Sequence, residues 1–398
     1  MSTITLRTSL SVLALALSLA GCASYEGLST SGKRLSTAEL QAGKTLAGVT
    51  LSPAAWPKSD WWRSLGDPQL DGLIGEALHD SPDMQIASAR AHQASAAALA
   101  ADAERMPTLD ANASVSRARL DRSQDPSGQG GRYSTSRSLG IDFNYTFDLW
   151  GGQRAAWEAA LGQARAAEVD RQAASLTLAA DVARAYSQLG QAYIVNDLTQ
   201  EDLKRTRQML DLGKRRLAAG IDSDYQLQQT ESLVASSEEQ AIDAAKQLRS
   251  AQIALAVLLG KGPDRAREIS RPALLQPAAV ALPSVLPAEL LGRRPDLVAA
   301  RWRVEAAGKS IDASKTRFYP NLNLTAAAGT QALLGDAIFG APSRFFNIAP
   351  TLSLPIFDGG RLRADLDARD ADYDLAVAQY NKSLVNALGE VSDSIDQL

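Results

Sequence analysis

The feature that most constrains the fold of this chain is a stretch without proline from about Gln153 to Ala218. Because proline breaks helices, its absence permits one continuous helix, which at about 1.5 Å per residue would be on the order of 100 Å long. Apolar residues recur in it at intervals of seven, the spacing of a coiled-coil seam. The seam comprises Val182, Leu189, Leu203, Leu210 and Leu217, with Asn196 in the remaining place.

A second helix is predicted from just after Gly220 to about Leu259, again with apolar residues at intervals of seven. Two such helices joined by a short turn predict an antiparallel coiled-coil hairpin. Because a rod of this kind has no globular core of its own, we expect neighbours at its sides and hence an assembly. The second seam comprises Leu227, Val234, Ala241, Leu248 and Leu255.

Four stretches alternate apolar and polar residues with period two, which is typical of a strand with two different faces. They lie at 109–116, 139–147, around 321–325 and at 347–356. Alternation alone favours a sheet with one face in solvent, but runs of about 10 residues also fit a transmembrane β-barrel with a wet lumen. The candidate lumen-facing residues are Asp110, Asn112, Asp142 and Asn144.

The chain contains an internal repeat at an offset of 213 residues, which takes Pro82-Asp83 onto Pro295-Asp296. A second pair of segments also matches: residues 147–152 have the sequence FDLWGG, and residues 357–360 have the sequence FDGG. Each repeat is therefore predicted to run helix, strand, strand, glycine pair and helix.

The N-terminus is similar to a bacterial lipoprotein signal peptide. Arg7 precedes an apolar run from Leu10 to Ala20, and Cys22 is the only cysteine of the chain. The resemblance implies removal of residues 1–21, a diacylglyceryl group on Cys22 and, since Ser24 is not aspartate, delivery to the outer membrane. The alternative is an ordinary signal peptide followed by cysteine by chance.

Delivery to the outer membrane favours a transmembrane β-barrel over a sheet with one face in solvent. Four strands cannot close a barrel, which usually needs at least eight, and an open edge in lipid is costly. We therefore expect a barrel shared between subunits, and a trimer contributing four strands each would give 12 strands.

The composition and the remaining motifs exclude several other functions. The 41 lysines and arginines against 45 acidic residues give a net charge of −4, which argues against nucleic acid as the main partner. His79 and His92 lack the spacing of a helical metal site, and no nucleophile, base and acid constellation occurs, so we expect neither a metal site nor an enzyme. Gly151-Gly152 and Gly359-Gly360 are interpreted as backbone turns, because neither pair has the spacing or lysine of a phosphate loop.

Five motifs together resemble the TolC-like outer membrane factors, and especially their lipidated branch, the OprM/NodT-type efflux lipoproteins. The resemblance runs from Cys22 to the last residue. The motifs are Trp61–Leu70, Pro82-Asp83, Leu291–Asp296, Phe318–Leu322 and Leu354–Gly360.

The resemblance implies a mainly helical chain whose long coiled-coil helices form an α-barrel tunnel, with four strands per chain in a shared 12-stranded trimeric β-barrel. It also implies partners: a periplasmic adaptor and an inner-membrane pump that feed the tunnel. The family places adaptor docking at the hairpin tip, which here offers Gly220, Ile221 and Ser223. Apart from the lipid on Cys22, no cofactor is expected.

The expected segments are a signal peptide over 1–21, an N-terminal segment over 22–80, a first repeat over 81–280 and a second over 281–398. Aligning Val182 with Val391 puts Leu189 opposite Leu398, so we expect the second repeat to lack its tip turn and returning helix. The family takes the aspartates that constrict the periplasmic entrance from that segment.

The sequence thus predicts a passive exit duct of an RND-type tripartite efflux system for drugs or other small molecules. The alternatives are the outer membrane component of type I protein secretion and a structural coiled-coil lipoprotein without a pore.

Overall fold

The structure is a computed structural model that describes residues 24–35, 60–119, 121, 131, 133–273, 294–332 and 337–396. The expected signal peptide, the lipidated Cys22 and the Leu291–Arg293 part of one motif lie outside the described residues. The chain divides into two compact units. We call them the hairpin unit (Ala42–Ala91 and Ala167–Asp296) and the sheet unit (Met1–Gln41, His92–Ala166 and Leu297–Leu398).

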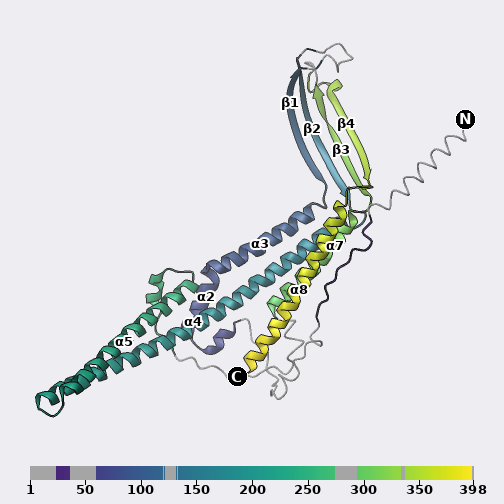
Figure 1. Cartoon of the computed structure of the whole chain (residues 1–398). Helices are drawn as coiled ribbons and strands as arrows, with labels where there is room; N and C mark the ends of the chain where they lie inside the picture. The colour runs from purple at the N-terminus through teal and green to yellow at the C-terminus, as the bar shows by residue number, and fades with distance from the viewer. Residues whose placement is uncertain are drawn as a thin grey trace, which may run out of the picture. The chain divides into compact units, whose positions relative to one another are not determined.

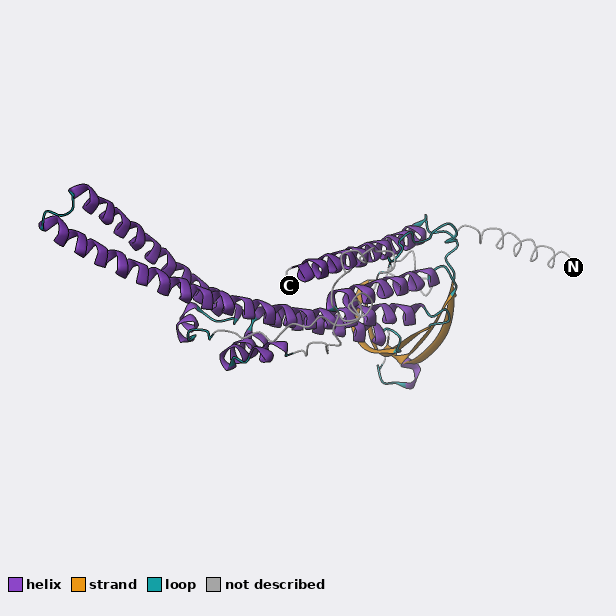
Figure 2. Cartoon of the chain, turned by 90° about the horizontal axis from the view of Figure 1, so that it is seen from below, coloured by secondary structure: helices purple, strands orange, loops and turns teal. Residues whose placement is uncertain are grey.

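Two long helices dominate the hairpin unit. Helix α4 runs without a break over Gly152–Ala218 and helix α5 over Asp224–Leu258, so both predicted helices are confirmed. They lie side by side and antiparallel (Figure 2). The seam is confirmed as well: Val182, Leu189 and Leu255 are fully buried, and the other seam residues are buried or half-buried.

Shorter elements cover the base of this hairpin. They are the 3-10 helix η1 (Trp61–Leu65), helix α2 (Pro68–Asp80), the start of helix α3 (Pro82–Ala103) and the 3-10 helix η3 (Pro263–Glu268). Leu70 and Ile74 of α2 are buried against the α4 and α5 side chains, and Trp61 and Trp62 pack at the margin of the same apolar cluster. This packing gives the Trp61–Leu70 motif its structural role.

Asp67 joins the motif to the long helix. Its carboxylate accepts from the backbone N–H of Gln69 at 2.8 Å, which caps α2, and from the hydroxyl of Tyr186 at 2.7 Å. Tyr186 is only 1% exposed. Burial, together with the neighbouring Asp67, raises the pKa of Tyr186, which keeps its hydroxyl a donor.

The sheet unit holds one antiparallel sheet of four strands in the order β1-β2-β3-β4 (Figure 1). The strands are β1 (Thr108–Arg119), β2 (Tyr133–Phe147), β3 (Asn321–Ala332) and β4 (Arg344–Ser353), with the 3-10 helix η4 (Ala341–Ser343) before β4. All four predicted strands are present, but the expectation that the fourth continues to Ile356 is wrong. The last paired residue is Ser353, and a proline alone does not end the ladder, since Pro350 lies within β4 opposite Leu324.

Helices α7 (Pro295–Thr316) and α8 (Arg361–Asp396) complete the sheet unit. The bounds of α7 and β3 lie 213 residues beyond those of α3 and β1, as the repeat predicts. No helix in the described part of the chain combines the length and the apolar character needed to span a membrane.

Each junction from a strand to a helix uses one aspartate and one or two glycines. Asp148 accepts from the backbone N–H groups of Gln153 and Arg154 at 3.1 and 2.9 Å, and Asp358 likewise caps α8. Gly151 and Gly359 take φ values of 74° and 70°, in the left-handed region that favours glycine. Both glycine pairs therefore serve as backbone turns, as expected.

An N-terminal strap, residues 24–35, runs along α8. Asp374 accepts from the backbone N–H groups of Ser31 and Gly32 at 3.0 and 2.7 Å. The Ser31 hydroxyl, together with these two N–H groups, lowers the pKa of Asp374. Seven residues further along α8, Asn381 accepts from the N–H of Leu35 at 2.8 Å. A Cβ on Gly32 would lie 2.9 Å from the Asp374 carboxylate, so glycine permits this close approach.

We expect Tyr186→Phe to lower the free energy of unfolding of the hairpin unit by about 1–3 kcal/mol, because Oδ2 of the buried Asp67 carboxylate loses the hydroxyl that donates to it, while Oδ1 keeps the backbone N–H of Gln69. Thermal unfolding of the detergent-solubilised protein measures this. Tyr193→Phe is the matched control, since Tyr193 is less buried and its hydroxyl accepts only from the side chain of Gln252. Equal stability of both variants would contradict the role given to Asp67.

Candidate functional site

The register of the sheet gathers the polar side chains of all four strands on one face. Asp110 of β1 lies opposite Asp142 of β2, and Asn144 lies between Thr108 of β1 and Thr325 of β3. Directly opposed residues project to the same side of a sheet. The four candidate lumen residues therefore share one face, as their sequence positions predict.

Side-chain hydrogen bonds link neighbouring strands on this polar face. Asn112 donates to the Asp142 carboxylate, and the hydroxyls of Ser114 and Ser138 lie 2.8 Å apart. Asp110 and Asp142 place two carboxylates opposite each other, where their like charges repel unless water and counter-ions surround them. This face is thus suited to contact with water and cations.

The opposite face is apolar and exposed. One row across the strands reads Leu109, Phe143, Ala326 and Ile348, and the next reads Ala111, Ile141, Ala328 and Phe346. Ile141 is 50% exposed and Phe346 is 84% exposed. A contiguous exposed apolar face marks a surface made to contact another apolar medium or protein.

Strands β2 and β3 approach each other closely at Gly140 and Gly329, which are directly paired. A Cβ on Gly329 would lie 2.3 Å from the carbonyl oxygen of Leu139, which is backbone and cannot move aside. A Cβ on Gly140 would meet nothing closer than the Asn112 side chain at 3.4 Å. Phe345 continues this row and puts one aromatic ring on the otherwise polar face.

The hairpin tip is fixed by a Schellman turn and an ion pair. Gly220 has a φ of 73°, and the N–H of Ile221 donates to the carbonyl of Arg216 at 2.9 Å. Arg216 also contacts both oxygens of Asp222, at 2.8 and 2.9 Å, which lowers the pKa of Asp222. The backbone N–H of Ser223 donates to the side chain of Gln226 at 2.9 Å as α5 begins.

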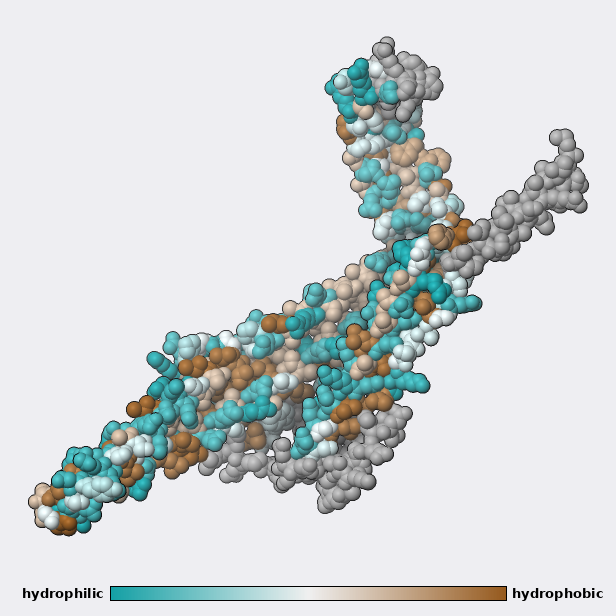
Figure 3. All heavy atoms as spheres, in the orientation of Figure 1, coloured by the Kyte–Doolittle hydropathy of each residue, from teal (hydrophilic) through white to brown (hydrophobic). Residues whose placement is uncertain are grey.

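The tip also carries apolar surface (Figure 3), and Ile221 is 64% exposed there. The structure thus brings Gly220, Ile221 and Ser223 together on one rigid turn. Ser223 takes the N-cap position of α5, whereas Asp222 binds Arg216.

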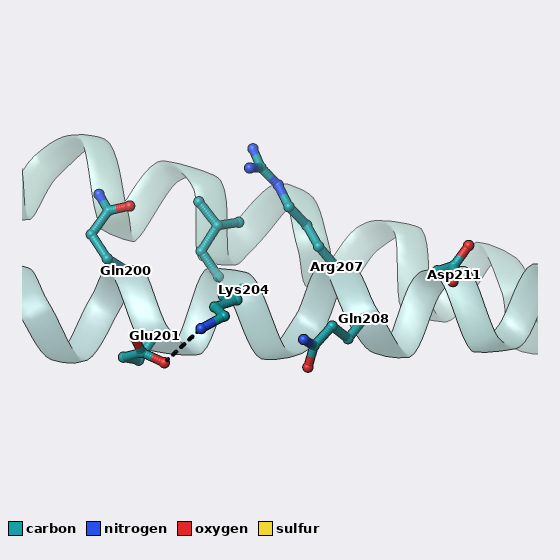
Figure 4. A pocket seen from close by; sticks show the side chains of 7 residues that line it. Gln200, Glu201, Lys204, Arg207, Gln208 and Asp211 are labelled. Atoms are coloured by element: carbon teal, nitrogen blue, oxygen red, sulfur yellow. Dashed lines mark ion pairs between the residues drawn. The ribbon is translucent and has the colours of Figure 1, made fainter.

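The described residues show no enclosed cavity suited to chemistry in the hairpin unit. A hollow of about 580 Å³ is lined by seven residues that all belong to α4, including Lys204 and Glu201, which form an ion pair at 3.8 Å (Figure 4). One helix cannot enclose a ligand, so this hollow is open surface. Within the described part of the chain, no cluster of three or more metal-ligating side chains occurs.

Sequence reasoning missed the close approach at Gly329, the aromatic ring of Phe345 and the strap contacts of Asp374. Gly329 lies beyond the pattern predicted around 321–325, but an isolated glycine in the strand that continues from it was an available signal for the first of these. No periodic pattern signals the other two.

Comparisons with known proteins agree with these surfaces. The family model described as outer membrane efflux protein matches residues 73–261 and 286–398. The chain is 38% identical over 368 residues to the fusaric acid resistance protein FusA of Burkholderia cepacia, which covers 91% of this chain and 69% of FusA. It is 31% identical to the multidrug resistance outer membrane protein MdtP of Escherichia coli K12, over 94% of this chain and 78% of MdtP.

The fold is similar to that of a solved outer membrane protein, VceC of Vibrio cholerae. The two superpose with a TM-score of 0.78 at 35% identity, over 86% of this chain and 81% of VceC.

We expect Gly329→Ala to disturb the pairing of β2 with β3, because the added Cβ collides with backbone, whereas Gly140→Ala should be tolerated. The measurement is resistance of the folded protein to SDS at graded temperatures, read from mobility on a gel. Identical melting of the two variants would show that the close approach does not constrain the sheet.

Proposed function

Because the chain belongs to the outer membrane efflux protein family, we propose that three copies of it form the exit duct of a tripartite efflux system. The protein is an outer membrane efflux channel, as its named relatives and solved structural neighbours are. The proposal concerns how it is assembled, what it binds and how material passes through it.

The main support for the proposal is a sheet with one polar face, one apolar face and two open edges. Its polar rows face one side and its exposed apolar rows the other, which is the arrangement of a barrel wall between lipid and water. β1 and β4 are the outer strands, and their outer edges pair with no other strand among the described residues. Three copies of this four-stranded sheet supply the 12 strands of one closed barrel.

In this assembly Asp110, Asn112, Asp142 and Asn144 line the pore. Three copies place six carboxylates of Asp110 and Asp142 at one level, which raises the local concentration of cations. Passage itself is passive and needs no cofactor.

The domain limits follow the repeat. An N-terminal segment over 22–80 precedes two structural repeats over 81–280 and 281–398. The equal spacing of α3 from α7 and of β1 from β3 supports this division.

The hairpin tip is the proposed docking site for a periplasmic adaptor, through Gly220, Ile221 and Ser223. A rigid turn with one exposed apolar side chain costs little conformational entropy when it binds. The adaptor connects the duct to an inner-membrane pump, which supplies the energy.

Cys22 is the proposed lipid attachment site, and the strap on α8 holds the chain that follows it. The names of the relatives, for fusaric acid resistance and multidrug resistance, support small organic molecules as the transported class.

Planar-bilayer recording tests the proposal. We expect ion channels that prefer cations, and the double variant Asp110→Asn with Asp142→Asn should lose most of that preference while single-channel events persist, because the carboxylates set the potential in the pore. Asp243→Asn, an exposed aspartate on α5, is the control and should conduct like the wild type. Absence of conductance from stable trimers would refute the duct.

A further inference from the structure

A hollow of about 480 Å³ lies at the foot of the sheet, where β2 leads into α4. One end is aromatic, with Tyr25 of the strap, Trp150 and Tyr319. The rest is lined mainly by charged side chains of both signs from α4 and α7. Figure 3 shows apolar surface at the foot of the sheet. Leu149, just after β2, and Phe357, just before α8, are both exposed.

The aromatic end is held in a fixed arrangement. The rings of Trp150 and Tyr319 are stacked with centroids 4.9 Å apart, and the Trp150 indole donates to the carbonyl of Pro320 at 2.7 Å. The hydroxyls of Tyr25 and Tyr319 lie 2.9 Å apart. Trp150 nevertheless remains 51% exposed. Rings with an apolar body and a polar tip concentrate at the boundary between membrane and water.

The charged end leaves one cation and one anion without a close partner. Glu158 is already occupied, by Arg154 at 3.0 Å and Lys309 at 2.8 Å. Among the described residues Lys315 has no ion pair, and Asp312 has only Lys309 at 3.9 Å. Three residues apart on α7, Lys315 and Asp312 lie on the same side of the helix. The hollow therefore offers Lys315, whose charge acts on the Asp370 carboxyl from beyond ion-pair distance, and Asp312, which has only the long contact with Lys309.

The chain tethers this hollow to the lipid anchor. Tyr25 is three residues after Cys22, and three extended residues span at most about 10 Å. If Cys22 carries acyl chains in the membrane, the hollow lies within about that distance of them, in the zone of the headgroups.

We propose that this hollow binds the headgroup of a phosphoethanolamine phospholipid from the leaflet that faces the periplasm. The lipid phosphate binds Lys315, its ammonium binds Asp312, and its chains continue over the apolar surface beside Trp150. The diacylglyceryl group of the protein's own anchor has no charge, so it does not match the two charged side chains, Lys315 and Asp312. This inference rests on the proposed function, because it requires the sheet to lie in the outer membrane.

Native mass spectrometry of the full-length trimer, released from detergent with added dioleoylphosphatidylethanolamine, tests the site. We expect wild type to retain the lipid and Lys315→Gln to retain about tenfold less, as loss of one charge-assisted hydrogen bond predicts. Asp312→Asn should lower retention of this lipid but not of dioleoylphosphatidylglycerol, which has no ammonium. Lys246→Gln removes one exposed charge from α5 and should match wild type.

Three results would overturn the site: equal retention by Lys315→Gln and wild type, equal retention of uncharged dioleoylglycerol, or equally strong binding of soluble glycerophosphoethanolamine. Conductance of the same preparations separates this inference from the channel. Trimers that conduct yet release the lipid refute only the headgroup site, whereas preparations that retain the lipid without conducting refute the duct and leave the site.

Discussion

The open edges of the four-stranded sheet are the constraint on which the rest of this structure depends. β1 and β4 each present a row of backbone groups that pair with no other strand in the described part of the chain. In hydrocarbon each such group costs several kcal/mol, so a sheet with an apolar outer face cannot remain open there. β1 and β4 run in opposite directions, so the β4 edge of one copy can continue the same antiparallel ladder on β1 of the next. Pairing between copies removes every edge at once.

The long helices also require neighbouring protein surfaces, because apolar side chains remain exposed on them. The seam of α4 and α5 buries one side of each helix, while Leu198, Leu212 and Ile242 stay exposed elsewhere on them. A two-helix rod buries too little apolar surface to be stable alone, and lateral neighbours would cover what remains. In the proposed trimer both halves of the molecule would therefore gain stability from assembly.

Periodicity in the sequence was sufficient to predict the long helices, the four strands and the shared face of Asp110, Asn112, Asp142 and Asn144. These features depend on repeats of seven and of two residues, which are local. The end of β4 at Ser353 could not be predicted from Pro355, because another proline, Pro350, lies inside the same strand.

Contacts between distant residues could not be predicted in this way. The bond from Ser31 to Asp374 joins positions 343 residues apart, and Asp67 meets Tyr186 across 119 residues. Both depend on how elements pack, which no single stretch of sequence encodes. That Asp312 is only weakly paired is recognisable only after Lys309 is seen to bind Glu158 at 2.8 Å and Asp312 at 3.9 Å.

Disulfide cross-linking between outer strands tests the central claim most directly. With Cys22→Ser the chain has no other cysteine, so one cysteine at Ala113 in β1 can be combined with one at successive positions of β4 from Phe345 to Ile348. Directly opposed residues of antiparallel strands lie about 4.5–5.5 Å apart, which suits a disulfide. The account predicts covalently closed trimers at positions on one face of β4, and chains that stay uncross-linked at every position would contradict it.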